Sequence, residues 1–177
     1  GDRVVICAEN RPEWAIADIA IMALGAIAVP AYTTNTTTDH MHILSNSAAK
    51  GAIVSTRELA KKLLPAAIDS GTCAFVASIE PLLIRQKLPL DVHAYEALIA
   101  HGKELKDDVV ETARQLGRET TSCIIYTSGT GGTPKGVELS HGAILCNAAG
   151  AYDVLKDGWS VGEEVFLSFL PMTHSYE

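Results

Sequence analysis

The sequence lacks the features that define several common protein classes. Its 14 Lys and Arg residues are outnumbered by 21 Asp and Glu, which gives a net charge of −7. Without basic clusters the chain has no surface suited to phosphate backbones, so nucleic-acid binding is excluded. The most apolar stretch, Trp14–Val29, contains Asp18 and is shorter than the roughly 20 residues of a membrane-spanning helix. It therefore indicates a buried helix and strand.

Metal-binding and disulfide patterns are also missing. The four cysteines form no CxxC pair, and no Cys/His cluster has the spacing of zinc ligands. Cys7, Cys123 and Cys146 lie within apolar runs, so we expect buried free thiols in a reducing cytoplasm. No Ser/His/Asp triad or carboxylate pair suggests a catalytic centre, and we assign no catalytic residue.

Apolar runs that alternate with helical patterns dominate the rest of the chain. Hydrophobic residues make up 47% of the sequence, enough for one sizeable core. Continuous apolar strands between helices are typical of an α/β fold, with a mostly parallel sheet covered by helices on both faces. The expected strands are Val4–Ala8, Ile27–Tyr32, Ala52–Ser55, Cys73–Ser78, Ser122–Tyr126 and Val165–Leu170, and the expected helices span 12–24, 39–48, 57–69, 93–101, 107–116 and about 140–156.

Local patterns make these expectations more specific. Asn10 followed by Glu13 resembles a capping box at the start of helix 12–24, which is apolar nearly all round and therefore expected to be buried. Trp14 is expected in the core. His40 and His42 are two residues apart, a spacing that shares a face only on a strand, so in a helix we expect both to be solvated.

The segment Ser122–His141, SCIIYTSGTGGTPKGVELSH, carries the clearest chemical signal. An apolar strand leads into a loop of glycines and hydroxyl residues with one basic residue, Lys135, and a helix is expected after it. Glycines let backbone N–H groups approach an anion closely, hydroxyls add hydrogen-bond donors, and the lysine adds a mobile positive charge. The segment therefore predicts a polyphosphate-binding loop.

Two other nucleotide motifs do not fit this loop. A Walker A loop needs Ser or Thr after its Gly-Lys pair, whereas Lys135 lies between Pro134 and Gly136. A dinucleotide fingerprint needs a third glycine where this chain has Pro134. A plain Gly/Thr surface loop has a similar composition, but the order of residues after an apolar strand argues against it.

The loop resembles the phosphate loop of the adenylate-forming superfamily, which includes AMP-forming acyl- and aryl-CoA synthetases, luciferases and peptide-synthetase adenylation domains. The usual form is YTSGTTGxPKGVxxxH, and this chain departs from it at Gly131, where the family usually has Thr. The opening GDRVVICAENRPEWAIADIAIMALGAIAVP and the closing LSFLPMTHSYE also resemble that superfamily. The closing segment is most similar to its long-chain fatty acyl-CoA synthetases.

The resemblance implies a two-step ligase that forms an acyl-adenylate from ATP and a fatty acid and then an acyl-CoA, with ATP, Mg²⁺ and coenzyme A as substrates and cofactor. His174 would border the acyl group, Thr127 would also approach Mg²⁺, and His141 would cap or orient the helix after the loop. The implied phosphate-binding residues are Thr127, Ser128, Gly129, Thr130, Gly131, Gly132, Thr133, Lys135 and Gly136.

The family enzymes are several times longer, so we expect residues 1–177 to be a fragment of the N-terminal AMP-binding (adenylation) domain, without the C-terminal domain and inactive alone. Adenylation of an aryl or amino acid stays open, as does a truncated, non-catalytic nucleotide-binding or interaction module. A fatty substrate would also allow peripheral membrane contact of a cytoplasmic protein, although no basic amphipathic helix supports it. The sequence leaves acyl chain length and oligomeric state undecided.

Overall fold

The computed structural model describes residues 1–127, 132–158, 165 and 167–173. Its strands are β1 (Arg3–Cys7), β2 (Ile27–Pro30), β3 (Gly51–Val54), β4 (Phe75–Ser78), β5 (Asp91–Ala94), β6 (Thr121–Thr127) and β7 (Lys135–Ser140). Its helices are α1 (Pro12–Ala23), α2 (Thr37–Ser47), α3 (Arg57–Ser70), α4 (Tyr95–Gly102), α5 (Val109–Arg114) and α6 (His141–Leu155), with a 3-10 turn η1 (Lys156–Gly158).

The strands form a seven-stranded sheet in the order β5-β4-β3-β1-β2-β6-β7. All neighbouring strands are parallel except β6 and β7, which form an antiparallel hairpin. β1 pairs with β2 and with β3 through four residues each, whereas β2 meets β6 through the single pair Ala28 and Cys123. The mostly parallel sheet expected from the sequence is confirmed.

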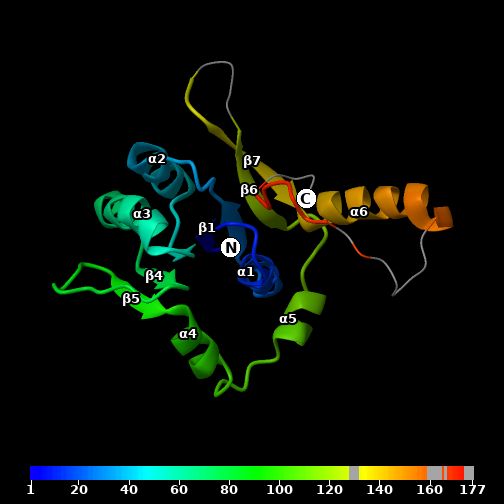
Figure 1. Ribbon diagram of the computed structural model, residues 1–177. Helices are drawn as coiled ribbons and strands as arrows, with labels where there is room; N and C mark the ends of the chain where they lie inside the picture. The colour runs from blue at the N-terminus through cyan, green and yellow to red at the C-terminus, as the bar shows by residue number, and fades with distance from the viewer. Residues whose placement is uncertain (128–131, 159–164, 166, 174–177) are drawn as a thin grey trace.

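Two apolar clusters cover opposite faces of the sheet. Figure 1 shows α2 and α3 on one side of the central strands and α1 on the other. On one face Val5 and Val29 contribute to a cluster with residues of α2 and α3, including the fully buried Leu44 and Leu63. On the other face the alternate strand residues, such as Ile6, pack with α1. Helices on both faces therefore follow from the continuous apolar strands, since every strand side chain needs an apolar neighbour.

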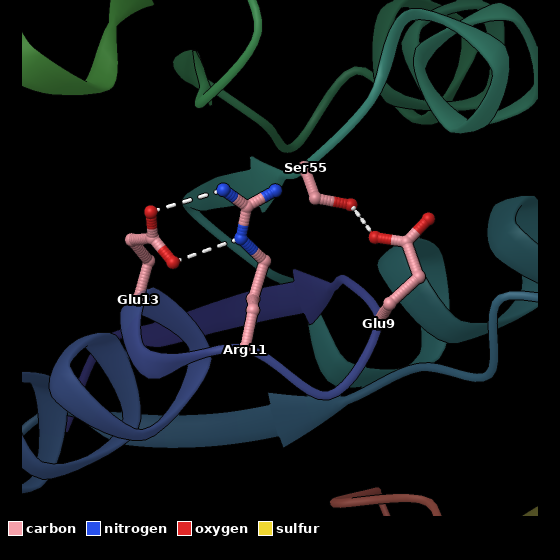
Figure 2. A network of polar contacts seen from close by, with 4 residues as sticks. All are labelled: Glu9, Arg11, Glu13 and Ser55. Atoms are coloured by element: carbon pink, nitrogen blue, oxygen red, sulfur yellow. Dashed lines mark hydrogen bonds and ion pairs between the residues drawn. The ribbon is translucent and has the colours of Figure 1, made fainter.

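The start of α1 differs from the expected capping box. Arg11 occupies the N-cap position, and its side chain makes no cap hydrogen bond. Glu13 instead forms two 2.9 Å hydrogen bonds with the Arg11 guanidinium, which lower the pKa of the Glu13 carboxyl to about 2 (Figure 2). The Asn10 side chain is engaged elsewhere, with the backbone near residue 170. Because both side chains have other partners, the box does not form.

Three burial predictions are also wrong. α1 buries Trp14 as expected, but Ile16 and Ile19 on its outer side are more than half exposed because the sheet covers only one side of this helix. Cys146 is exposed because α6 has no buried residue. His40 is fully buried rather than solvated, since it shares the inner face of α2 with Leu44. The other three cysteines are buried free thiols, as expected.

Two strands were not predicted from the sequence, and one predicted strand is not seen in the described residues. β5 and β7 were not expected, and β7 lies where a helix was expected to follow the loop directly. The described residues of the predicted strand Val165–Leu170, namely 165 and 167–170, form no strand. Leu170 directs its carbonyl to the Asn10 side chain rather than to a neighbouring strand. In the described ranges, no helix has the length and apolar character needed to cross a membrane.

The connections after β1 and β3 run in opposite directions across the sheet, towards β2 and β4. In parallel sheets such a point leaves a crevice at the carboxyl ends of the strands, where ligands often bind. Here polar side chains bridge the two strand ends: Ser55 after β3 donates a hydrogen bond to the Glu9 carboxylate after β1, beside the Arg11–Glu13 pair (Figure 2). The carboxyl edge of the sheet is therefore ordered by side-chain contacts near β1.

Candidate functional site

The β6–β7 hairpin brings two of the predicted phosphate-binding residues together. In its register Thr127, the last residue of β6, lies opposite Lys135, the first residue of β7, and both are exposed. Gly132 and Thr133, which were also predicted to bind phosphate, precede β7 and are exposed. Gly132 has a φ of +87°, a conformation that favours glycine. Ser128, Gly129, Thr130 and Gly131 lie outside the described residues, as does His174.

Helix α2 contacts the hairpin where the loop between β6 and β7 begins and ends. The His42 Nε2–H donates to the Pro134 carbonyl over 2.8 Å, and the Tyr126 hydroxyl donates to Asn46 Oδ1 over 2.6 Å. The His42 and Tyr126 rings also meet edge to face, with centroids 5.9 Å apart. The sequence reading missed these contacts, and the i,i+4 spacing of His42 and Asn46 on one helix was the available signal.

A cavity of about 420 Å³ lies beside the loop end of the hairpin. It is lined by Pro30, Tyr32, Asn35, Asp39, Ile43, Tyr126, Thr127 and Pro134. Two of its polar side chains already have partners: Tyr126 donates to Asn46, and Asp39 belongs to a capping box at the start of α2. The Thr36 backbone N–H and hydroxyl donate to the Asp39 carboxylate and lower its pKa. The other polar lining residues are Tyr32, Asn35 and Thr127.

The described part of the chain contains no group of three His, Cys, Asp or Glu residues that could hold a metal ion. Thr127 alone could contribute one hydroxyl ligand. Mg²⁺ in phosphate-binding sites keeps several waters and takes phosphate oxygens as ligands. The residues present therefore fit Mg²⁺ only when it arrives with phosphate groups.

Gly136 has a packing role beside its place in the loop motif. A Cβ at this position would lie 2.7 Å from Ile124 Cγ2 and 3.2 Å from the Tyr126 ring. We expect Gly136→Ala to lower the free energy of unfolding by about 1–3 kcal/mol, because the added methyl group overpacks this contact. Urea unfolding followed by circular dichroism measures the change.

Gly150 provides the matched control for this prediction. It lies inside α6 with nothing within 4 Å of a Cβ placed there. Gly150→Ala should raise the free energy of unfolding by up to about 1 kcal/mol, because alanine favours helix more than glycine. Equal effects of the two substitutions, in size and sign, would contradict the packing role of Gly136.

Residues after the hairpin show how the following helix begins. Ser140 is the N-cap of α6, and its hydroxyl accepts a 3.2 Å hydrogen bond from the Ala143 N–H. His141 is the first helical residue, so the capping role considered for it belongs to Ser140. The structure thus brings together Thr127, Lys135 and Gly136 at the loop end of the hairpin, where α2 contacts the neighbouring Tyr126 and Pro134.

A known protein family matches the whole length of this chain. The family model described as AMP-binding enzyme matches residues 1–177. The chain belongs to this family. Among curated members, Long-chain-fatty-acid--CoA ligase FadD15 of Mycobacterium tuberculosis is 35% identical over 176 residues, which cover 98% of this chain and 28% of that protein.

Other AMP-binding relatives show the same partial coverage. Long chain acyl-CoA synthetase 6, peroxisomal, of Arabidopsis thaliana is 30% identical over 184 residues, covering 100% of this chain and 25% of that protein. The chain thus spans about a quarter of the length of these relatives. The A domain of carboxylic acid reductase from Segniliparus rugosus, solved with AMP and a co-purified carboxylic acid, has a TM-score of 0.74 at 20% identity, covering 99% of this chain and 30% of that one. That likeness shows the fold of adenylate-forming enzymes.

Proposed function

We propose that these residues belong to an enzyme that activates a fatty acid with ATP as an acyl-adenylate and then transfers the acyl group to coenzyme A. The pairing of Thr127 with Lys135 at the mouth of an anchored hairpin carries the proposal. It is supported by membership of the AMP-binding enzyme family and by relatives named as long-chain acyl-CoA synthetases.

In this proposal the hairpin binds and orients the phosphates of ATP. Lys135 neutralises charge on the β- and γ-phosphates, and the Thr127 hydroxyl donates to a phosphate oxygen. His42 contacts Pro134 and Asn46 contacts Tyr126, and these contacts hold both ends of the loop before ATP binds. The loop therefore loses less conformational entropy when it binds ATP. Mg²⁺ held by Thr127 and phosphate oxygens would supply further charge neutralisation.

The reaction as a whole needs more than this chain contains, and we propose that residues 1–177 alone do not complete it. The chain spans about a quarter of its curated relatives, and adenine, ribose and coenzyme A need binding groups beyond those assigned here. We also propose a cytoplasmic location, which is supported by the buried free thiols Cys7, Cys73 and Cys123.

The proposal is tested on the gene product that contains this sequence, expressed at its natural length. ATP–pyrophosphate exchange and AMP release are measured with panels of fatty, aryl and amino acids, with and without coenzyme A. We expect exchange that depends on fatty acids and AMP release that depends on coenzyme A, and neither from the 177-residue chain alone. Preference for aryl or amino acids would replace the proposed substrate class, and ATP binding without acid-dependent exchange would indicate a non-catalytic nucleotide-binding module.

A further inference from the structure

Asn10 joins the first loop of the protein to its last described segment. The Asn10 Nδ2–H donates to the Leu170 carbonyl over 2.6 Å, and Asn10 Oδ1 accepts from the Met172 N–H over 3.0 Å. One amide side chain thus satisfies a backbone carbonyl and a backbone N–H two residues apart, the pattern that a neighbouring strand would otherwise supply. Residues 170–172 are therefore held at the carboxyl end of β1 without forming a strand.

The neighbours of Asn10 restrict its position. Glu9 accepts a hydrogen bond from Ser55, and Arg11 is paired with Glu13 (Figure 2). Asn10 lies between these two anchored residues, directly after the central strand β1. Its amide is therefore presented from a loop whose neighbouring side chains are both held by polar contacts, which suits a group that positions another segment.

The segment held by Asn10 is the one that leads into His174. Met172 packs against the cluster that contains Trp14 and Cys123. Thr173 is 5% exposed, and its hydroxyl has no hydrogen-bond partner among the described residues. A buried hydroxyl without a partner is costly unless a ligand or water satisfies it.

The same segment forms one wall of a cavity of about 360 Å³ at the carboxyl ends of β1 and β2. Pro171, Met172 and Thr173 line this wall, opposite Glu9 and the residues that follow β2, Tyr32, Thr33 and Thr34. Thr173, whose hydroxyl has no partner among the described residues, therefore borders a cavity.

We propose that Asn10 is a positioning residue for the carboxylic acid substrate, and this inference rests on the proposed function. By fixing the backbone of Leu170 and Met172, Asn10 determines where Thr173 can meet the acid. ATP binding uses the β6–β7 hairpin, which Asn10 does not contact in the described structure. Loss of Asn10 should therefore affect the acid and not ATP.

Kinetics of the natural-length gene product test this inference. Asn10→Ala should raise the KM for the fatty acid by about tenfold or more, since small misplacement of a positioning contact is costly, while the KM for ATP changes by less than about twofold. Asn10→Asp keeps an acceptor for the Met172 N–H but places a carboxylate oxygen against the Leu170 carbonyl, so its acid KM should rise at least as much as that of Asn10→Ala.

Ser78→Ala is the control for a purely structural effect. Ser78 is 1% exposed, and its hydroxyl donates to the Glu80 carbonyl, so its loss destabilises the fold away from residues 170–173. An equal rise in acid KM in Ser78→Ala, an equal rise in both KM values in Asn10→Ala, or an unchanged acid KM in Asn10→Ala would overturn the inference. An inactive wild-type enzyme would instead refute the proposed function, on which the inference depends.

Discussion

Lys135→Ala is expected to reduce kcat/KM for acyl-adenylate formation by about a hundredfold or more. Removing one preorganised donor to developing charge typically costs 10²–10³ in rate. Lys135 is held opposite Thr127 by the hairpin register, so its backbone position is fixed while its ammonium group can reach phosphate oxygens. The loss is measured by ATP–pyrophosphate exchange on the natural-length gene product.

Lys61 offers a matched control for this substitution. It lies on α3, is largely exposed and forms a 2.6 Å ion pair with Glu58. Ion pairs between exposed side chains contribute little to the stability of a fold. Lys61→Ala should leave the exchange rate within about twofold of the wild type. Lys135→Arg retains the charge with a different geometry and should retain part of the activity. A loss below about threefold in Lys135→Ala would remove Lys135 from the phosphate site.

When the pH falls from neutral to about 4, the free energy of unfolding is expected to decrease by about 3 kcal/mol less in His40→Leu than in the wild type. Burial, opposed by the nearby Asp39 and reinforced by Lys62, lowers the pKa of His40 from 6.5 to about 4. The unfolded chain therefore binds this proton more readily than the folded protein does. The stabilisation is fully present above pH 6.5 and is lost as the pH falls towards 4, at about 1.4 kcal/mol per pH unit.

Asp18 should show the opposite behaviour and serves as the comparison. Burial at the edge of an apolar cavity raises the pKa of its carboxyl from 3.8 to about 6. The folded protein then binds this proton more readily, so the contribution of Asp18 to stability increases as the pH falls from 6 to 3.8. Urea unfolding between pH 7.5 and pH 4 should give a shallower acid loss for His40→Leu and a steeper one for Asp18→Asn. Parallel curves for the three proteins would contradict both assignments.

The elements that could be predicted from sequence are those whose apolar pattern is decided locally. β1 and β3 are short continuous apolar runs, and α3 carries its buried residues at helical spacing between the Thr56 cap and Gly71. The phosphate loop is a prediction that depends on the specific order of its glycines, hydroxyls and lysine. Of that set, the structure places Thr127 opposite Lys135, whereas residues 128–131 lie outside the described ranges.

The features that were missed depend on contacts between distant residues. β7, KGVELS, has no continuous apolar run and is a strand because β6 supplies its hydrogen bonds. The burial of His40 depends on which face of α2 meets the sheet, and its i,i+4 spacing with Leu44 was the overlooked signal. Asn10 looked like a helix cap because its partners are 160 and 162 residues away.

The β6–β7 hairpin meets the rest of the sheet through one ladder pair, Ala28 and Cys123, yet it shares both apolar clusters with the central strands. Ile124 and Tyr126 lie in the cluster that contains Val29, and Cys123 lies in the cluster on the other face. Side-chain packing rather than backbone hydrogen bonding therefore joins the hairpin to the sheet, and opening it would expose apolar surface on both faces. A substrate that contacts both the hairpin and the loop at Asn10 would bind the closed sheet more tightly than the open one. Substrate occupancy and local opening would then be thermodynamically linked.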